Sequence, residues 1–352
     1  MPVTKDEYYH LLAMKMIKND CETLKALVPT LNQPYILLSS MPYLSLFCKS
    51  FEDYCHSQGK NIAISNASRY SIETVRSKLK LFGKRFDIAT LSTEKIDRIL
   101  DDLYLHHNLG IIYDSKSHII TNTQYLLFLF QPKEMEKCDL SNVDIGLLGK
   151  AIGTVINSVS KGLSKYSIPG IPLIANKRYT LFYYDIITDM QPLCNKECGL
   201  SKAISLLILH ILCSVNYCLY IINDIVKDAN PWKLRVQYIS LYYAFMQLDR
   251  ISQNLPSGAV RDTLVTIRAE VEPIINPDFR SCLMHYGFIN KAQYLIDDNY
   301  LNYAIPFFGL VESCFGGKEY CDLLGRVNQG LVSMSNALTQ FMGIEPKNLL
   351  II

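Results

Sequence analysis

The residues with the most specific chemistry in this sequence stand close together in NPDFRSCLMHYGF, which spans residues 276–288. Arg280 is followed directly by Ser281, and His285 lies five positions after the arginine. A histidine can accept or donate a proton near neutral pH, and an arginine can bind a phosphate through two parallel hydrogen bonds. RNA carries its own nucleophile, the 2′-hydroxyl group, so cleavage needs a proton-transfer group and a group that stabilises the developing negative charge. The segment supplies both.

A helix start explains the first residues of this segment. Asn276 is a good N-cap, Pro277 suits the first helical position, and Asp278 complements the positive end of the helix dipole. On such a helix Arg280 and His285 lie roughly 140° apart around the axis. They can act on one phosphate if the arginine wraps around the helix, if the helix distorts, or if a second copy of the site supplies partners.

A purely structural interpretation of the same residues also exists. Arg280 can be a surface arginine that pairs with Asp278, and His285 can be a core histidine hydrogen-bonded to Ser281, which lies four positions earlier on the same helical face. Both interpretations predict the same helix, so the helix alone does not distinguish them.

The half of the chain around the motif favours the catalytic interpretation. Apolar residues recur at helical spacing over residues 234–248 and 324–341, which predicts bundle helices on both sides of the motif. Residues 200–343 resemble the HEPN (higher eukaryotes and prokaryotes nucleotide-binding) family, and FRSCLMH is similar to its signature of arginine, a polar residue, three further residues and histidine. The family most often has asparagine, aspartate or histidine where this chain has Ser281.

The resemblance implies a metal-independent endoribonuclease that uses no cofactor and leaves a cyclic 2′,3′-phosphate. Its catalytic residues would be Arg280, Ser281 and His285, and Tyr286 would contact an RNA base or pack in a dimer interface. The resemblance also implies a homodimer in which two motifs face each other across a shared cleft. Such proteins are toxins or antiviral abortive-infection effectors, restrained by an antitoxin or another regulatory protein.

The first 130 residues predict a mixed α+β module. Helices are expected over residues 5–27 and 43–58, and a helix-turn-helix is expected around residues 62–85, with a polar break at 68–71. Ser92 is the expected cap of a further helix, which a hairpin with strands near 110–113 and 118–121 follows. Helix and hairpin together resemble a winged-helix unit that recognises or senses a ligand.

Five basic residues on or just after the second of these helices form a predicted RNA-binding surface: Arg76, Lys78, Lys80, Lys84 and Arg85. An alternative is that they are the solvated face of a small packing module. A second alternative for the whole chain is a non-enzymatic regulator that binds nucleic acid or protein through this surface, with the helical half as a dimerisation domain.

The sequence therefore predicts a mainly α protein in three parts. Residues 1–130 form the winged-helix-like module, residues 131–199 form a linker and connecting segment, and residues 200–352 form the HEPN-like helical domain. The connecting segment is expected to contain a helix over 143–163 and extended structure over 166–186.

Composition limits the remaining possibilities. The net charge of +2 gives no global attraction to nucleic acid. The composition, with 49% hydrophobic and 19% charged residues, excludes a disordered chain. The 11 cysteines lack the spacing of a zinc site, and the polar N-terminal residues lack the apolar core of a signal peptide. We expect no metal site, reduced thiols and a cytoplasmic location.

One segment could cross a membrane by its length. Residues 203–222 are uncharged over 20 positions, but they include His210, Asn216 and two serines. Polar groups are costly in hydrocarbon, and helices that are apolar on all sides also occur at the centre of large domains. We therefore expect a buried core helix and no stable membrane association.

Overall fold

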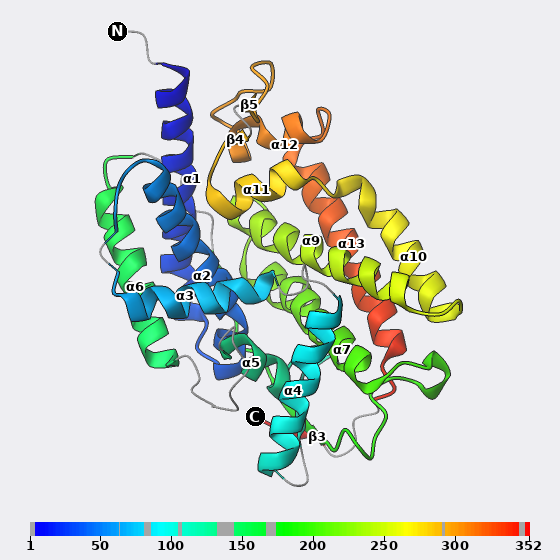
Figure 1. The fold of residues 1–352 in the computed structure, drawn as a ribbon. Helices are drawn as coiled ribbons and strands as arrows, with labels where there is room; N and C mark the ends of the chain where they lie inside the picture. The colour runs from blue at the N-terminus through cyan, green and yellow to red at the C-terminus, as the bar shows by residue number, and fades with distance from the viewer. Residues whose placement is uncertain are drawn as a thin grey trace.

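The computed structural model describes residues 4–62, 64–80, 86–104, 108–131, 144–166, 174–290, 293–344 and 349–352. The protein is mainly helical and has a small antiparallel sheet (Figure 1). This confirms the predicted fold class at the level of a mainly α chain with α and β elements in its first third.

The first part of the chain is built from long helices. They are α1 (Lys5–Leu27), α2 (Pro34–Ser57), α3 (Asn66–Leu79), α4 (Phe86–Tyr104), α5 (Thr123–Phe130) and α6 (Ile145–Gly162). The helix predicted over 5–27 is confirmed, and Thr4 begins it through a capping box with Glu7. The helix predicted over 43–58 starts earlier, because Pro34 occupies its first turn and Pro42 is accommodated inside it.

The predicted turn at residues 68–71 is wrong, because α3 runs through it without a break. Ser65 caps the helix by accepting a hydrogen bond from the backbone N–H of Ser68 at 3.2 Å. Ser71 donates to the carbonyl oxygen of Ala67 at 3.1 Å, which lets a serine remain in the helix. Ser92 lies inside α4, which begins at Phe86, so its predicted role as a cap is also wrong.

The predicted hairpin is confirmed and belongs to a larger sheet. Its strands are β1 (Leu109–Asp114) and β2 (Ile119–Asn122). The sheet also contains β3 (Leu181–Ile186) and β6 (Leu350–Ile351). The strand order is β2-β1-β3-β6, and every pairing is antiparallel. The hairpin is thus one edge of a sheet that joins residues from all three predicted parts of the chain.

The second half of the chain supplies the central helices. They are α7 (Lys202–Asn216), a π-helical turn (Tyr217–Ile222), α8 (Asn223–Ile225), α9 (Pro231–Asn254), α10 (Ala259–Val271), α11 (Pro277–His285), α12 (Leu310–Cys314) and α13 (Tyr320–Phe341). A short hairpin of β4 (Ile289–Asn290) and β5 (Gln293–Tyr294) follows α11. The two predicted apolar stripes are the buried faces of α9 and α13. Helix α9 packs against α1, α7, α10, α11 and α13, which places it at the centre of the fold (Figure 1).

The apolar segment 203–222 is a core helix, as predicted. Every residue of α7 from Ala203 to Asn216 is buried except Ile204. The Asn216 side chain donates to the carbonyl oxygen of Ile119 and accepts from Ser335, so its polar groups are satisfied inside the protein. Within the described part of the chain, this helix and its continuation to Ile225 are the one stretch long and apolar enough to cross a membrane, and most of it is buried.

Candidate functional site

The motif segment forms the predicted helix α11. The side-chain oxygen of Asn276 accepts hydrogen bonds from the backbone N–H groups of Asp278 and Phe279, both at 2.9 Å. Phe279 is fully buried and anchors the first turn. The helix ends at His285, and Tyr286 follows with a φ of 55°, in the left-handed region.

A buried arginine from α9 fixes the end of this helix. Arg235 is 1% exposed, and its Nε donates to the carbonyl oxygen of Leu283 at 2.7 Å. Its guanidinium also contacts the Asp20 carboxylate and the Tyr286 hydroxyl, which itself donates to Asp20 at 2.8 Å. A left-handed backbone costs a non-glycine residue on the order of 1 kcal/mol, and this network holds Tyr286 in it. Core contacts therefore set the position of the neighbouring His285.

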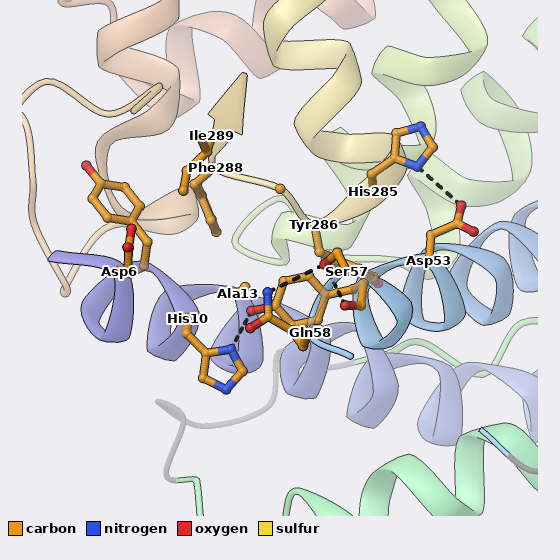
Figure 2. A pocket seen from close by; sticks show the side chains of 13 residues that line it. Asp6, His10, Ala13, Asp53, Ser57, Gln58, His285, Tyr286, Phe288 and Ile289 are labelled. Atoms are coloured by element: carbon orange, nitrogen blue, oxygen red, sulfur yellow. Dashed lines mark hydrogen bonds and ion pairs between the residues drawn. The ribbon is translucent and has the colours of Figure 1, made fainter. Parts of the chain in front are cut away.

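His285 lies against a carboxylate from α2. Its Nδ1 is 3.3 Å from Oδ2 of Asp53 (Figure 2), and the two side chains are 39% and 30% exposed. A carboxylate next to Nδ1 keeps the proton on that nitrogen and orients the ring, which leaves Nε2 for proton transfer. This is the arrangement that a general base requires. The structure does not show the alternative hydrogen bond between His285 and Ser281, because Nδ1 of His285 faces Asp53 instead.

Asp53 is ionised throughout the physiological pH range. Burial alone would raise the pKa of its carboxyl group, but contacts with His285 and Lys49 and the charges of Lys49 and Arg76 lower it to about 2. The Lys49 ammonium lies 2.9 Å from Oδ1 of Asp53, so the two carboxylate oxygens have different partners. The negative charge beside His285 is therefore permanent above about pH 3.

The pair borders a pocket of about 610 Å³ between α1, α2 and the segment that follows α11 (Figure 2). A pocket of this size can hold a nucleotide, since small-molecule sites typically measure about 300–1,000 Å³. Aromatic side chains contribute to its walls, among them Tyr9, Tyr54 and Phe288. All three rings are buried, and Tyr9 already stacks on Tyr294, so they form a rigid apolar wall of the pocket.

A second histidine lines the same pocket. His10 of α1 has its Nδ1 2.7 Å from the hydroxyl oxygen of Tyr54, and the two rings are stacked. Burial, followed by the charges of Lys60 and Lys165, lowers the pKa of His10, which favours its neutral form. The pocket thus holds two imidazoles in different environments, one beside a carboxylate and one beside a phenol.

Arg280 lies on another side of α11. Its guanidinium carbon is 5.1 Å from the ring centroid of Tyr242 and 5.9 Å from that of Tyr243, both on α9, and its Nε is buried without a hydrogen-bond partner among the described residues. Arg280 is not part of the lining of the pocket that His285 borders. Arg280 and His285 therefore do not line one common pocket within a single chain.

Two further predicted site residues have no visible role in binding. Tyr286 is among the residues that line the pocket, but it is 0% exposed and its hydroxyl is held by Asp20 and Arg235, so its ring is a core group that cannot contact an RNA base. Ser281 is partly exposed, and its hydroxyl makes no hydrogen bond to a described residue.

The predicted basic surface is largely absent. Arg76 and Lys78 are 6% and 5% exposed, and Lys78 lies over the ring of Phe128 with its Nζ 4.5 Å from the centroid. Both point into the interior because α3 packs between α2, α5 and α6. Lys80 is partly exposed, and Lys84 and Arg85 lie outside the described residues.

Arg76 has an unusual environment. Two of its nitrogens, Nε and Nη2, are buried without a hydrogen-bond partner among the described residues. Burial lowers the pKa of its guanidinium, and the neighbouring Asp53 and Tyr243 act in the opposite direction. Its positive charge therefore supports the ionised state of Asp53 from inside the protein.

Sequence reasoning missed Asp53, His10 and Tyr54. None belongs to a recognisable motif, and each is far from His285 along the chain. Asp53 is adjacent to a lysine–glutamate pair on α2 that looks like an ordinary helix surface. Only the packing of α1 and α2 against α11 reveals these residues as neighbours.

No family model, curated protein or solved structure matches this chain. The HEPN resemblance therefore rests on residues 280–285 and their helical context alone. Within the described residues, no group of three or more histidine, cysteine, aspartate or glutamate side chains is arranged to hold a metal ion.

Proposed function

We propose that this protein is a metal-independent endoribonuclease in which His285, oriented by Asp53, transfers the proton. The observation that carries the proposal is the contact of a partly exposed histidine with a permanently ionised aspartate at the edge of a nucleotide-sized pocket. Buried structural histidines normally lack this access to solvent and to a cavity.

The reaction follows from these groups. His285 Nε2 removes the proton of the ribose 2′-hydroxyl group, whose oxygen attacks the adjacent phosphorus. The bond between phosphorus and the 5′-oxygen then breaks, and that oxygen takes up a proton. The products are a cyclic 2′,3′-phosphate and a free 5′-hydroxyl group, and no electrons are exchanged.

Arg280 is the proposed phosphate-stabilising residue, and it is the reason for proposing a homodimer. A single chain separates Arg280 from the pocket of His285. Two chains that associate through their α11 helices would allow the arginine of one chain to act with the histidine of the other. Ser281 would be close to such an interface.

The family assignment and the biological role remain part of the proposal. We propose a HEPN-type helical domain and a sensing role for the N-terminal residues 1–130. A cytoplasmic toxin or abortive-infection effector restrained by a regulatory protein fits this activity. Because Arg76 and Lys78 are buried, we do not include them among the RNA contacts, and the non-enzymatic alternative loses part of the surface it needs.

The direct test is an RNA cleavage assay. The full chain is incubated with total RNA and with a short single-stranded oligonucleotide, with and without EDTA. We expect cleavage in both conditions and products that carry cyclic 2′,3′-phosphate ends, detected by mass spectrometry. Cleavage that EDTA abolishes, or products with 3′-hydroxyl ends, would exclude the proposed chemistry.

Mixing two inactive variants tests the shared site. If Arg280 and His285 act across a dimer, the Arg280→Ala and His285→Ala proteins, each inactive alone, will regain activity when mixed and allowed to exchange subunits. Each mixed dimer then contains one site with both residues intact, so up to about a quarter of the wild-type activity is expected at equal amounts, by simple statistics of pairing. No recovery despite demonstrated subunit exchange would mean that the two residues act within one chain or not together.

A further inference from the structure

A second pocket lies away from the motif, at the turn of the β1–β2 hairpin. Its volume is about 190 Å³. It is bounded by residues 114–116 and His118 of the turn, by residues 177–180 before β3, by Tyr220 of the π-helical turn and by Asp224 of α8. Charged and hydroxyl-bearing side chains from these three segments face one small space, although none belongs to the site proposed above.

A histidine in this pocket is held from two directions. Nδ1 of His118 is 2.8 Å from Oδ2 of Asp114, and the other carboxylate oxygen of Asp114 accepts the backbone N–H of His118 at 2.9 Å. The imidazole also stacks on the ring of Tyr220, with centroids 3.7 Å apart and planes at 6°. Ring position and tautomer are therefore fixed, and Nε2 makes no hydrogen bond to a described residue.

The helix beneath this histidine is irregular. Tyr220 belongs to the π-helical turn Tyr217–Ile222, which interrupts the path from α7 to α8. Single π-helical turns inside α-helices frequently occur at functional sites, where they displace a side chain from the regular helical position. Here the displaced residue provides the platform for His118.

The charges in the pocket leave a positive excess. The Lys177 ammonium is paired with Asp224, and Asp114 is occupied by His118. Lys116 and Arg178 also line the pocket and are exposed, and neither forms an ion pair with a described residue. Two cationic side chains are thus available to a ligand.

A hydroxyl group adds a further donor. The Tyr179 hydroxyl is buried and forms no hydrogen bond of standard geometry within the described residues. Burial, followed by the nearby Asp224 and Asp114 carboxylates, raises the pKa of this phenol, so it keeps its proton and can donate it in a hydrogen bond. The segment that carries it also carries Arg178.

We propose that this pocket binds the phosphate group of a phosphate monoester. Lys116 and Arg178, which form no ion pair with a described residue, can attract the negative charge of a monoester. Arg178 can bind two phosphate oxygens at once, Lys116 supplies a point charge, and Nε2 of His118 faces the same space as a further polar contact. The pocket, at about 190 Å³, is smaller than the roughly 300–1,000 Å³ of typical small-molecule sites, so a ligand much larger than a phosphate extends beyond it. The inference does not depend on the proposed ribonuclease activity.

Calorimetric titration of the full chain tests this site. The probes are inorganic phosphate, a nucleoside 5′-monophosphate and the corresponding unphosphorylated nucleoside, at constant ionic strength. We expect one saturable site for both phosphates and none for the nucleoside. Tighter binding of the monophosphate identifies an organic ester as the ligand, and equal binding identifies free phosphate.

Variants then assign the residues. Arg178→Ala and Lys116→Ala should each weaken phosphate binding about tenfold, since each removes one charge-assisted contact. His118→Phe keeps the stacking on Tyr220 and removes the ring nitrogens, with a similar loss expected. Lys161→Ala, an exposed lysine on α6, is the matched control and should bind as the wild type does.

Three results would overturn the proposal. They are the absence of saturable phosphate binding, wild-type affinity in all three pocket variants, and equal binding of nucleoside and monophosphate. Thermal melting of each variant, which should show one cooperative unfolding transition, separates a loss of binding from a loss of folding.

Discussion

Replacing Arg235 with methionine is expected to lower the free energy of unfolding by about 3–5 kcal/mol, the usual effect of removing one partner from a buried ion pair. Arg235 is 1% exposed and serves four groups: the Asp20 carboxylate, the Tyr286 and Ser50 hydroxyls and the carbonyl oxygen of Leu283. Methionine fills similar space but cannot donate a hydrogen bond. It leaves the carboxylate of Asp20 in the core without a counter-charge.

A neighbouring lysine on α9 is the matched control for this variant. Lys233 is 2% exposed, but its partner Asp228 has a side chain that is 77% exposed and can be solvated when the lysine is lost. Lys233→Met should therefore cost only about 1 kcal/mol. Urea denaturation of both variants measures the difference in their free energies of unfolding, provided that both depend on the urea concentration with the same slope.

A double variant separates the charge from the packing. In Arg235→Met with Asp20→Asn no uncompensated charge remains, so most of the lost stability should return. Equal stability of the single and double variants, or a cost for Arg235→Met no larger than that for Lys233→Met, would show that the buried charge does not dominate. Because the network also positions the end of α11, the single variant should lose RNA cleavage activity as well.

The elements predicted correctly are those whose signals are local. Asn276 and the residues after it specify the start of α11 within one helical turn, and the stripes of α9 and α13 repeat over several turns. The turn at Asp114 specified the β1–β2 hairpin in the same way. In each case the residues that decide the structure are sequence neighbours.

The errors concern residues whose environment depends on distant parts of the chain. Charged residues such as Arg76 and Lys78 are normally exposed, and no neighbouring residue shows that tertiary packing buries them here. The break predicted at Ser68–Ser71 failed because the apolar face of α3, with Ile72 and Val75, packs into the core and outweighs the weak helix propensity of serine.

The candidate site shows the same limit. Sequence spacing made His285 and Arg280 the candidate site residues, and it predicted that they would lie about 140° apart around the helix axis. It could not identify Asp53, because the contact of Asp53 with His285 depends on how α2 packs against α11. A one-dimensional pattern identifies the helix that carries the histidine, and the packing of another helix determines which group orients it.

Replacing His285 with alanine is expected to reduce RNA cleavage by roughly 100- to 10,000-fold, the usual contribution of a general acid or base. The side chain is 39% exposed and its contact with Asp53 is partly solvated, so the free energy of unfolding should change by only about 1 kcal/mol or less. His56→Ala is the matched control, because His56 is exposed on the last turn of α2, the helix that carries Asp53. It should cleave RNA as the wild type does.

One further variant links this loss to the proposed chemistry. Asp53 has a pKa lowered to about 2 by its contacts with His285 and Lys49, so its carboxylate keeps its charge beside the imidazole at every pH above about 3. Asp53→Asn removes the charge that orients the imidazole and should reduce cleavage about 10- to 100-fold. Wild-type cleavage by Asp53→Asn or by His285→Ala would exclude the pair as the proton-transfer group.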